Sequence, residues 1–293
     1  MIVAIGRSLT ITIERFRSRS PMTSSEEVET TVEGLAPEIY APQVTGGYFP
    51  MRRLDDIISP IAIVIPALNE KESVGRVLDA VRSLDFPSIL IVVDGRSRDG
   101  TVEIARGKKA EVLFQKRIGY GDALQTGFQH VLEKHRASII TMMDADGTYD
   151  VRDLSRLVRP IIDGKADFAI GNRFHNMDEG AMTLSNKIGN IVISKLVNSL
   201  LGIQVTDSQC GIRAFRSSLV KDFRNCSNGM PFATEMLATA ARKGARIVEL
   251  PVRYHTRTGT TKLNPLIDGA KIVRMILANA SRNRNNGHGP EFL

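Results

Sequence analysis

Two aspartates separated by one residue stand where an apolar run ends. Asp144 and Asp146 close the run at residues 138–143, and Gly147 then interrupts the chain. A second apolar run, residues 89–93, ends in Asp94 in the same way. Carboxylate oxygens at strand ends suit a hard cation such as Mg²⁺ or Mn²⁺, which also binds the oxygens of phosphates. The pattern predicts a cation and a diphosphate at one sheet edge, although an Asp-x-Asp can also form a turn or a helix cap.

The elements that must position these aspartates alternate between strand and helix. A β-branched run at residues 61–65 predicts a buried strand, and we expect Pro66 to end it. Further strands are predicted at residues 89–93, 111–115, 138–143, 167–170 and 246–252, and helices at residues 74–84, 101–106, 122–135, 184–201 and 233–243. The alternation predicts an α/β fold, with a mostly parallel central sheet flanked by helices and the ligand at the carboxyl ends of its strands.

The chain of 293 residues is long enough for one large α/β domain. Residues 1–50 are basic at first and then rich in Ser, Thr, Glu, Pro and Gly, which predicts a mobile leader. We expect the folded domain at residues 51–280 and a disordered tail at residues 281–293. The last predicted helix, residues 266–280, has an apolar side and a basic side. It either packs on the core or rests on a bilayer.

The amino-acid composition limits the kinds of binding partner but does not identify one. The net charge of +7 favours anionic partners, either phosphorylated substrates, lipid headgroups or nucleic acid. The charge is dispersed and aromatic residues make up only 5% of the chain, so we expect no nucleic-acid partner. Cys210 and Cys226 lack the spacing of a metal finger, which favours a reducing compartment. No run approaches the ~18 apolar residues of a membrane-spanning helix, so we expect any membrane contact to be peripheral.

Three motifs carry a resemblance to a known family. They are PALNE at residues 66–70, DGRSRDGT at residues 94–101 and DAD at residues 144–146. Their order and spacing resemble those of family 2 glycosyltransferases with the GT-A fold. Later motifs at residues 171–174, 207–213 and 232–235 resemble the branch that contains dolichyl-phosphate mannosyltransferases and polyprenyl-phosphate glycosyltransferases. The resemblance covers about residues 61–277.

The resemblance implies a metal-dependent, inverting glycosyltransferase. It would move a sugar from a nucleoside-diphosphate sugar to dolichyl or polyprenyl phosphate at the cytoplasmic membrane face. The implied nucleotide-sugar-binding residues lie at strand ends and in the loop at residues 117–123; they are Pro66, Ala67, Leu68, Asn69, Glu70, Asp94, Gly121, Ala123, Asp144 and Ala145. Leu68 replaces an aromatic residue that the mannosyltransferases usually carry, so the sequence does not predict which nucleotide base the donor contains.

The same resemblance implies the catalytic groups. Asp144 and Asp146 would hold Mg²⁺ or Mn²⁺, which offsets the charge that builds on the departing nucleotide. The predicted catalytic residues are Asp146, Arg213 and Glu235, and the predicted phosphate-binding residues are Arg173, Arg257 and Lys262. Glu235 would serve as a base for a hydroxyl acceptor, or it is only a carboxylate favoured at a helix start. A phosphate acceptor is already ionised and needs no base.

Other readings use the same residues differently. A soluble acceptor, such as a sugar, glycerate phosphate or a protein hydroxyl, would keep the fold and change the substrate. A sugar nucleotidyltransferase should carry a glycine-rich loop after the first strand, which residues 66–70 do not provide. Thr148 replaces a Gln that can join the metal ligands in close relatives. We do not assign His255 as a metal ligand, because ordinary packing or hydrogen bonding explains a lone histidine better.

Overall fold

The computed structural model describes residues 2–5, 8–11, 59–257, 272 and 274. The chain divides into two units, residues 1–50 and 51–293. In the first unit, β1 (Ile2–Ile5) pairs antiparallel with β2 (Ser8–Ile11). This short sheet differs from the mobile leader expected there. Residues 12–58 lie outside the described part of the chain, so for them the leader stays a prediction.

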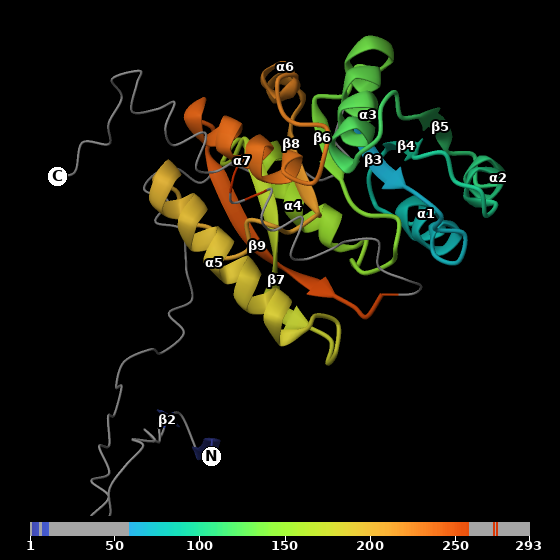
Figure 1. The fold of residues 1–293 in the computed structure, drawn as a ribbon. Coiled ribbons are helices and arrows are strands. Elements are labelled where there is room, and N and C mark those ends of the chain that lie inside the picture. The colour runs from blue at the N-terminus through green and yellow to red at the C-terminus, as the bar shows by residue number, and fades with distance from the viewer. Residues whose placement is uncertain (1, 6–7, 12–58, 258–271, 273, 275–293) are drawn as a thin grey trace, which may run out of the picture. The chain divides into compact units, whose positions relative to one another are not determined.

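A seven-stranded sheet forms the centre of the second unit (Figure 1). Its strands, in the spatial order β5-β4-β3-β6-β8-β7-β9, are β5 (Glu111–Phe114), β4 (Ser88–Asp94), β3 (Ile61–Ala67), β6 (Ile139–Met142), β8 (Arg213–Arg216), β7 (Phe168–Met177) and β9 (Ile247–Tyr254). Only β8 runs antiparallel to its neighbours in this sheet. The mostly parallel sheet predicted from the sequence is confirmed.

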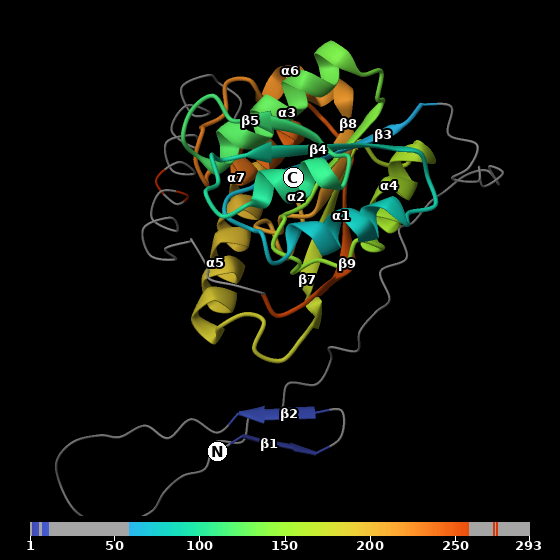
Figure 2. The ribbon, with the colours of Figure 1, turned by 90° about the vertical axis from the view of Figure 1, so that its right-hand side faces the viewer.

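Helices cover both faces of the sheet. They are α1 (Val74–Arg82), α2 (Thr101–Gly107), α3 (Tyr120–Lys134), α4 (Asp153–Ile162), α5 (Leu184–Leu201), α6 (Val220–Phe223) and α7 (Phe232–Arg242). Figure 2 shows α3 and α6 on one side of the sheet and α1 and α4 on the other. A hydrogen bond of 3.0 Å from Ser155 to Asp85 joins α4 to the segment after α1. Within the described residues, no helix has both the length and the apolar character needed to cross a membrane.

The core explains the continuous apolar runs of the central strands. Ile63, Val64, Ile91 and Val92 are fully buried because helices cover both faces. On one face, α3 lies close to the sheet at Gly127, where a Cβ atom would be 2.4 Å from Val64 Cγ1. The sheet therefore fixes the position of α3, whose first residue reaches the candidate site.

The prediction that Pro66 ends its strand is wrong, because β3 continues to Ala67. The carbonyl of Ala67 accepts a hydrogen bond from Gly95 N at 2.8 Å on the β4 side. Neighbouring residues of a strand direct their backbone groups to opposite sides, so Pro66 faces the β6 side. There the pairing of β3 ends at Val64. The missing N–H of Pro66 therefore costs no ladder hydrogen bond.

Candidate active site

Three parallel strands bring the acidic residues to one edge of the sheet. Ala67 and Asp94 are partners at the carboxyl ends of β3 and β4. Asp144 follows β6, which pairs with β3 on its other side. The expected gathering of Asp94, Asp144 and Asp146 at the carboxyl edge is confirmed. This is the edge where open α/β sheets bind ligands.

The loops after β3 and β4 are joined by hydrogen bonds. The backbone N–H groups of Asn69, Glu70 and Lys71 donate to side chains of the second loop. The acceptors are Ser97 Oγ at 2.8 Å, Thr101 Oγ1 at 2.8 Å and Asp99 Oδ2 at 3.1 Å, respectively. In return, the side chain of Asn69 accepts from Arg98 N at 2.9 Å. The two loops therefore form one continuous, hydrogen-bonded wall beside the site.

Asp94, at the end of β4, holds the second loop in place through hydrogen bonds. Its side chain is fully buried, and its two oxygens accept hydrogen bonds from Ser97 N at 2.8 Å and Ser97 Oγ at 2.5 Å. Leu68 stands at the rim of the same wall with 41% of its surface exposed. Direct contact of these residues with a nucleotide stays a prediction. What the geometry shows is that Asp94 shapes the second loop through Ser97.

Asp146 is held by its own turn and by an arginine. Its Oδ1 atom accepts hydrogen bonds from Thr148 N at 3.0 Å and Thr148 Oγ1 at 2.7 Å. Its Oδ2 atom lies 3.0 Å from Nη1 of Arg257. The second nitrogen of the same guanidinium, Nη2, is 2.5 Å from Glu70 Oε1. Arg257 therefore links the loop after β3 to the carboxylate pair.

Asp144 lies beside the hydroxyl of Tyr120 and the backbone of Gly211. Tyr120, at the start of α3, donates its hydroxyl hydrogen to Asp144 Oδ1 at 3.0 Å. A Cβ atom on Gly211 would be 2.7 Å from Asp144 Oδ2, so only glycine fits beside this carboxylate. Tyr149 fixes that glycine, because its hydroxyl oxygen accepts from Gly211 N at 2.7 Å. Tyr120, Tyr149 and Gly211 were not predicted as site residues, although Tyr120 and Gly211 lie within motifs that carry the family resemblance.

The carboxylate pair suits a divalent cation. Burial, together with the negative charge of Asp146, raises the pKa of Asp144 to about 7. Such a rise means that the ionised pair lacks enough positive charge nearby. Two carboxylates whose charges interact supply the oxygen ligands that Mg²⁺ and Mn²⁺ prefer. The residues therefore fit the cation that the sequence predicts.

Two arginines of the predicted site, Arg173 and Arg213, are hydrogen-bonded to other groups of the protein. Arg173 is 7% exposed, and it forms a two-pronged ion pair with Asp207 through Nε at 2.6 Å and Nη2 at 2.7 Å. Arg213 is fully buried and donates to the carbonyl oxygens of Ser208, Cys210 and Ala233. Burial lowers the pKa of Arg213. Phosphate binding by Arg173 and a catalytic role of Arg213 stay predictions, and Lys262 lies outside the described residues.

The glycines of the loop before α3 make room for protein backbone. A Cβ atom on Gly121 would be 2.4 Å from Ser227 O, and Asp122 N donates to Asn228 O at 2.9 Å. Ala123 is buried behind them. The close approach expected for a nucleotide is thus made by residues 227–228. Glu235 holds this segment from the other side, because its carboxylate accepts a hydrogen bond from Ser227 N.

Comparison with known proteins identifies the family. The profile of the family described as Glycosyl transferase family 2 matches residues 62–224. The chain belongs to glycosyl transferase family 2. It is therefore a glycosyltransferase, as its sequence motifs predict.

Two relatives of this glycosyltransferase have informative names. A dolichyl-phosphate hexose transferase of Haloferax volcanii is 36% identical over 220 residues, covering 74% of this chain and 92% of the relative. An undecaprenyl-phosphate mannosyltransferase of Micrococcus luteus is 33% identical over 228 residues, covering 73% and 92% of the two chains. Both names specify a lipid phosphate, dolichyl phosphate in one and undecaprenyl phosphate in the other.

The solved structures confirm the GT-A fold of this glycosyltransferase. One is glucosyl-3-phosphoglycerate synthase from Mycobacterium tuberculosis, crystallised with Mn²⁺, UDP and glucosyl-3-phosphoglycerate. It superposes with a TM-score of 0.63 at 19% identity, covering 80% of this chain and 87% of that chain. Another structure of the same synthase contains Mg²⁺ and UDP.

Proposed function

We propose that this glycosyltransferase moves a sugar from a nucleoside-diphosphate sugar to the phosphate of a dolichyl or polyprenyl phosphate, with Mg²⁺ or Mn²⁺ held by Asp144 and Asp146. The observation that carries the proposal is this carboxylate pair at the carboxyl edge of the sheet, with a pKa of Asp144 raised to about 7. The lipid acceptor is supported by the names of the relatives from Haloferax volcanii and Micrococcus luteus.

Different residues would hold the cation ligands and bind the diphosphate. The cation would offset the negative charge of the departing nucleoside diphosphate. Tyr120 and Thr148 hold the two aspartates in place through hydrogen bonds of 3.0 and 2.7 Å. Arg257 lies beside the carboxylate pair, next to Asp146. We propose that its guanidinium turns from Asp146 to a phosphate oxygen when the donor binds.

The acceptor phosphate attacks the anomeric carbon directly, which inverts that carbon. Such an acceptor is ionised near neutral pH and requires no general base. The carboxylate of Glu235 agrees with this, because it is occupied by the backbone N–H of Ser227. We therefore propose a positioning role for Glu235 in place of the base predicted for a hydroxyl acceptor.

We further propose that the enzyme works peripherally at the cytoplasmic membrane face. Leu184, Ile188 and Val192 recur at intervals of four residues on α5 and are 73%, 53% and 58% exposed. This spacing places them on one side of the helix. An apolar stripe of this kind suits the boundary between lipid headgroups and acyl chains. The substitution Val192→Asp should reduce flotation with liposomes, whereas Leu132→Asp, at an exposed leucine of α3, should not.

The deciding experiment measures product formation with the full chain. A panel of labelled UDP- and GDP-sugars is supplied with Mn²⁺ and a short-chain polyprenyl phosphate, and the label is followed into the organic phase. Asp146→Asn should lower the rate about 100-fold or more, since it removes a charge that holds the cation, while Asp79→Asn on the surface of α1 should not. The parallel acceptors are polyprenol without phosphate and 3-phosphoglycerate. Equal transfer to those acceptors would overturn the lipid-phosphate assignment, and full activity of Asp146→Asn would overturn the metal assignment.

A further inference from the structure

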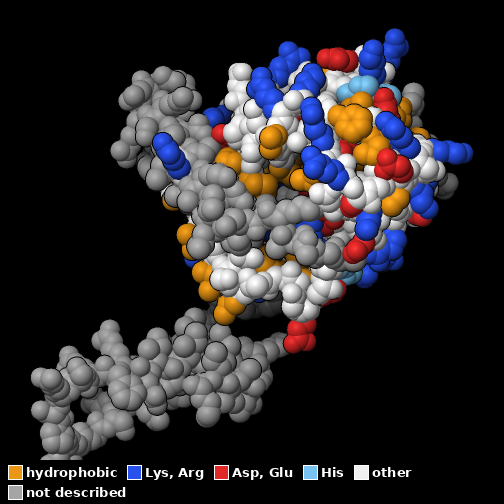
Figure 3. Space-filling view, turned by 45° about the vertical axis from the view of Figure 1, so that its right-hand side comes forward, with side chains coloured by type: hydrophobic (Ala, Val, Ile, Leu, Met, Phe, Trp, Pro, Cys, Tyr) orange, Lys and Arg blue, Asp and Glu red, His pale blue; other side chains and the backbone are white. Residues whose placement is uncertain are grey.

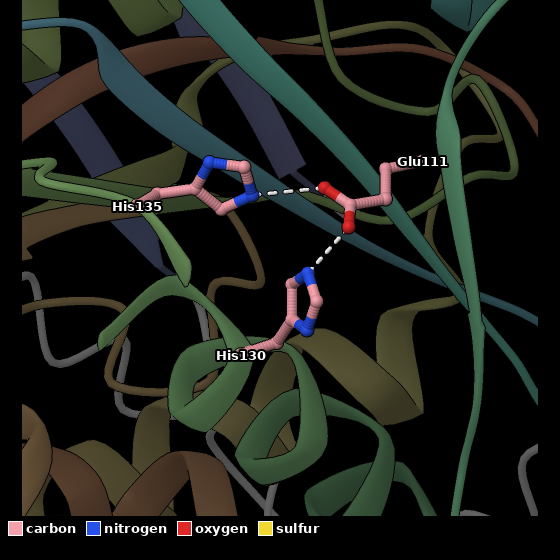
Figure 4. A group of neighbouring side chains, drawn as sticks. All are labelled: Glu111, His130 and His135. Atoms are coloured by element: carbon pink, nitrogen blue, oxygen red, sulfur yellow. Dashed lines mark hydrogen bonds and ion pairs between the residues drawn. The ribbon is translucent and has the colours of Figure 1, made fainter. Parts of the chain in front are cut away.

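A cluster of two histidines and one glutamate lies outside the site described above. His130 belongs to the last turns of α3, His135 directly follows that helix, and Glu111 begins β5. Figure 4 shows the two imidazole rings turned toward the same carboxylate. The Nε2 atom of His130 is 2.5 Å from Glu111 Oε1, and that of His135 is 2.9 Å from Glu111 Oε2. One donor atom from each side chain lies within 4.8 Å of the other two.

We propose that Glu111, His130 and His135 form a binding site for a transition-metal ion of the Zn²⁺ type. Two imidazole nitrogens and a carboxylate oxygen are a common ligand set for four-coordinate Zn²⁺, with water as the fourth ligand. Ligands about 2 Å from a tetrahedral ion are about 3.3 Å apart. The three donor atoms lie within 4.8 Å of one another, so each pair must change its separation by at most about 1.5 Å to reach that spacing. Small rotations of the side chains therefore suffice to place an ion between them.

The cluster is both reachable and chemically distinct from the aspartate pair. The side chains of His130, His135 and Glu111 are 18%, 24% and 39% exposed, so an ion can enter from solvent. Imidazole nitrogen selects Zn²⁺ and related ions, whereas Mg²⁺ prefers oxygen ligands.

The position in the fold separates this cluster from the catalytic edge. In the parallel pairing of β4 with β5, Glu111 lies opposite Ile91, and Phe114 lies opposite Asp94. Glu111 is therefore at the amino end of β5. The helix α3 has 15 residues, which corresponds to about 22 Å from Tyr120 to its last turn. A metal ion at the far end would tie α3 to the edge strand β5.

The site is best tested by metal binding to the full chain. The protein is stripped of metal and titrated with Zn²⁺ while excess Mg²⁺ occupies the oxygen-ligand site. We expect one equivalent of Zn²⁺ to bind, and Co²⁺ to give the visible absorption of a tetrahedral complex. Zn²⁺ at 100 times its dissociation constant should raise the Tm by about 5 °C.

Variants assign the binding to these residues. His130→Gln combined with His135→Gln should weaken Zn²⁺ binding at least tenfold. His175→Gln, at an exposed histidine outside the cluster, and Asp146→Asn should both retain it. In the wild-type protein, the side-chain ¹⁵N signals of two histidines should shift on addition of Zn²⁺, which needs no substitution. Absence of such shifts, or unchanged Zn²⁺ affinity in the double variant, would show that the cluster is only an ion pair.

Discussion

The guanidinium of Arg257 lies 3.0 Å from Oδ2 of Asp146 and so occupies one oxygen of the proposed cation site. The same side chain reaches Glu70 Oε1 at 2.5 Å. Its Nε atom is buried and has no hydrogen-bond partner among the described residues. A metal ion would therefore compete with this guanidinium for Asp146, whereas a diphosphate would attract the guanidinium. The free protein partly neutralises its own carboxylate pair.

Replacing Arg257 should therefore separate metal binding from nucleotide binding. In Arg257→Ala, Mn²⁺ alone should bind about tenfold more tightly, which corresponds to about 1.4 kcal/mol, because no guanidinium competes for Asp146. Binding of the nucleoside diphosphate should weaken, because a phosphate-binding cation is lost. Electron paramagnetic resonance of Mn²⁺ measures the first effect, and calorimetry with the nucleotide measures the second. Arg106→Ala on α2 is the matched control, and a weaker Mn²⁺ affinity in Arg257→Ala would contradict the prediction.

Metal binding should depend on pH through Asp144. The pKa of this carboxyl is raised to about 7, so below that pH the cation must displace a proton. The Mn²⁺ affinity should fall by about tenfold for each pH unit well below 7. In the metal-free protein, the pKa of Asp144 is higher in the folded state than in the unfolded state, so the folded state keeps this proton up to a higher pH. Stability falls as the pH rises from 3.8 toward about 7, and bound metal should offset this loss.

Tyr120 should set the midpoint of this pH dependence. Its hydrogen bond to Asp144 lowers the pKa of the carboxyl, against the larger rise caused by burial and by Asp146. In Tyr120→Phe that bond is absent, so the midpoint for Mn²⁺ binding should move to higher pH. The measurement is the Mn²⁺ affinity of both proteins across neutral pH. An unchanged midpoint would mean that Tyr120 does not act on Asp144.

Gly211 should be intolerant of any side chain. A methyl group there would lie 2.7 Å from Asp144 Oδ2 and 3.1 Å from the Tyr149 hydroxyl. Gly211→Ala should displace the carboxylate and weaken Mn²⁺ binding tenfold or more, since misplaced ligands lose metal affinity. Gly189→Ala is the matched control, because a Cβ atom at Gly189 has no neighbour within 4 Å. Equal Mn²⁺ affinity in both variants would show that Asp144 can move without loss.

Gly127 should contribute to stability and not to chemistry. A Cβ atom there would be 2.4 Å from Val64 Cγ1 and 2.9 Å from Val93 Cγ2. Gly127→Ala should lower the free energy of unfolding by about 1–3 kcal/mol, because α3 must move off the sheet. Denaturant unfolding gives the value. Gly189→Ala, in the open part of α5, should instead be neutral or stabilising by up to about 1 kcal/mol, and equal effects of the two substitutions would refute the packing argument.

The sequence predicts the central strands and the acidic edge because these depend on local patterns. The apolar runs at residues 61–65 and 89–93 correspond to β3 and β4, and the helical pattern at residues 184–201 corresponds to α5. Several elements were not predicted, and β8 and α4 are two of those in the large unit. The strand β8 has only four residues, and α4 contains Pro160, which is typical of a break in a helix.

The contacts in the site that the sequence does not predict have a common cause, which is pairing over long sequence separations. Asp207 is 34 residues from Arg173, and the two side chains form an ion pair. Ser227 lies more than a hundred residues from Gly121, yet its carbonyl fills the space that the glycine leaves. Neither partner can be chosen from the local sequence. The motif residues 66–70, 94–101 and 144–146 lie at the strand ends that the sequence predicts, while their contacts required the fold.

The hydrogen bonds between residues 69–71 and 97–101 have a consequence for protein engineering. We expect a change in one of these loops to shift the backbone of the other, so the two segments should act together in the nucleotide binding predicted for them. Transplanting only the PALNE segment from a relative with a different nucleotide preference would leave its amide groups opposite the wrong acceptors. Donor preference should therefore transfer between relatives only when both segments are exchanged together.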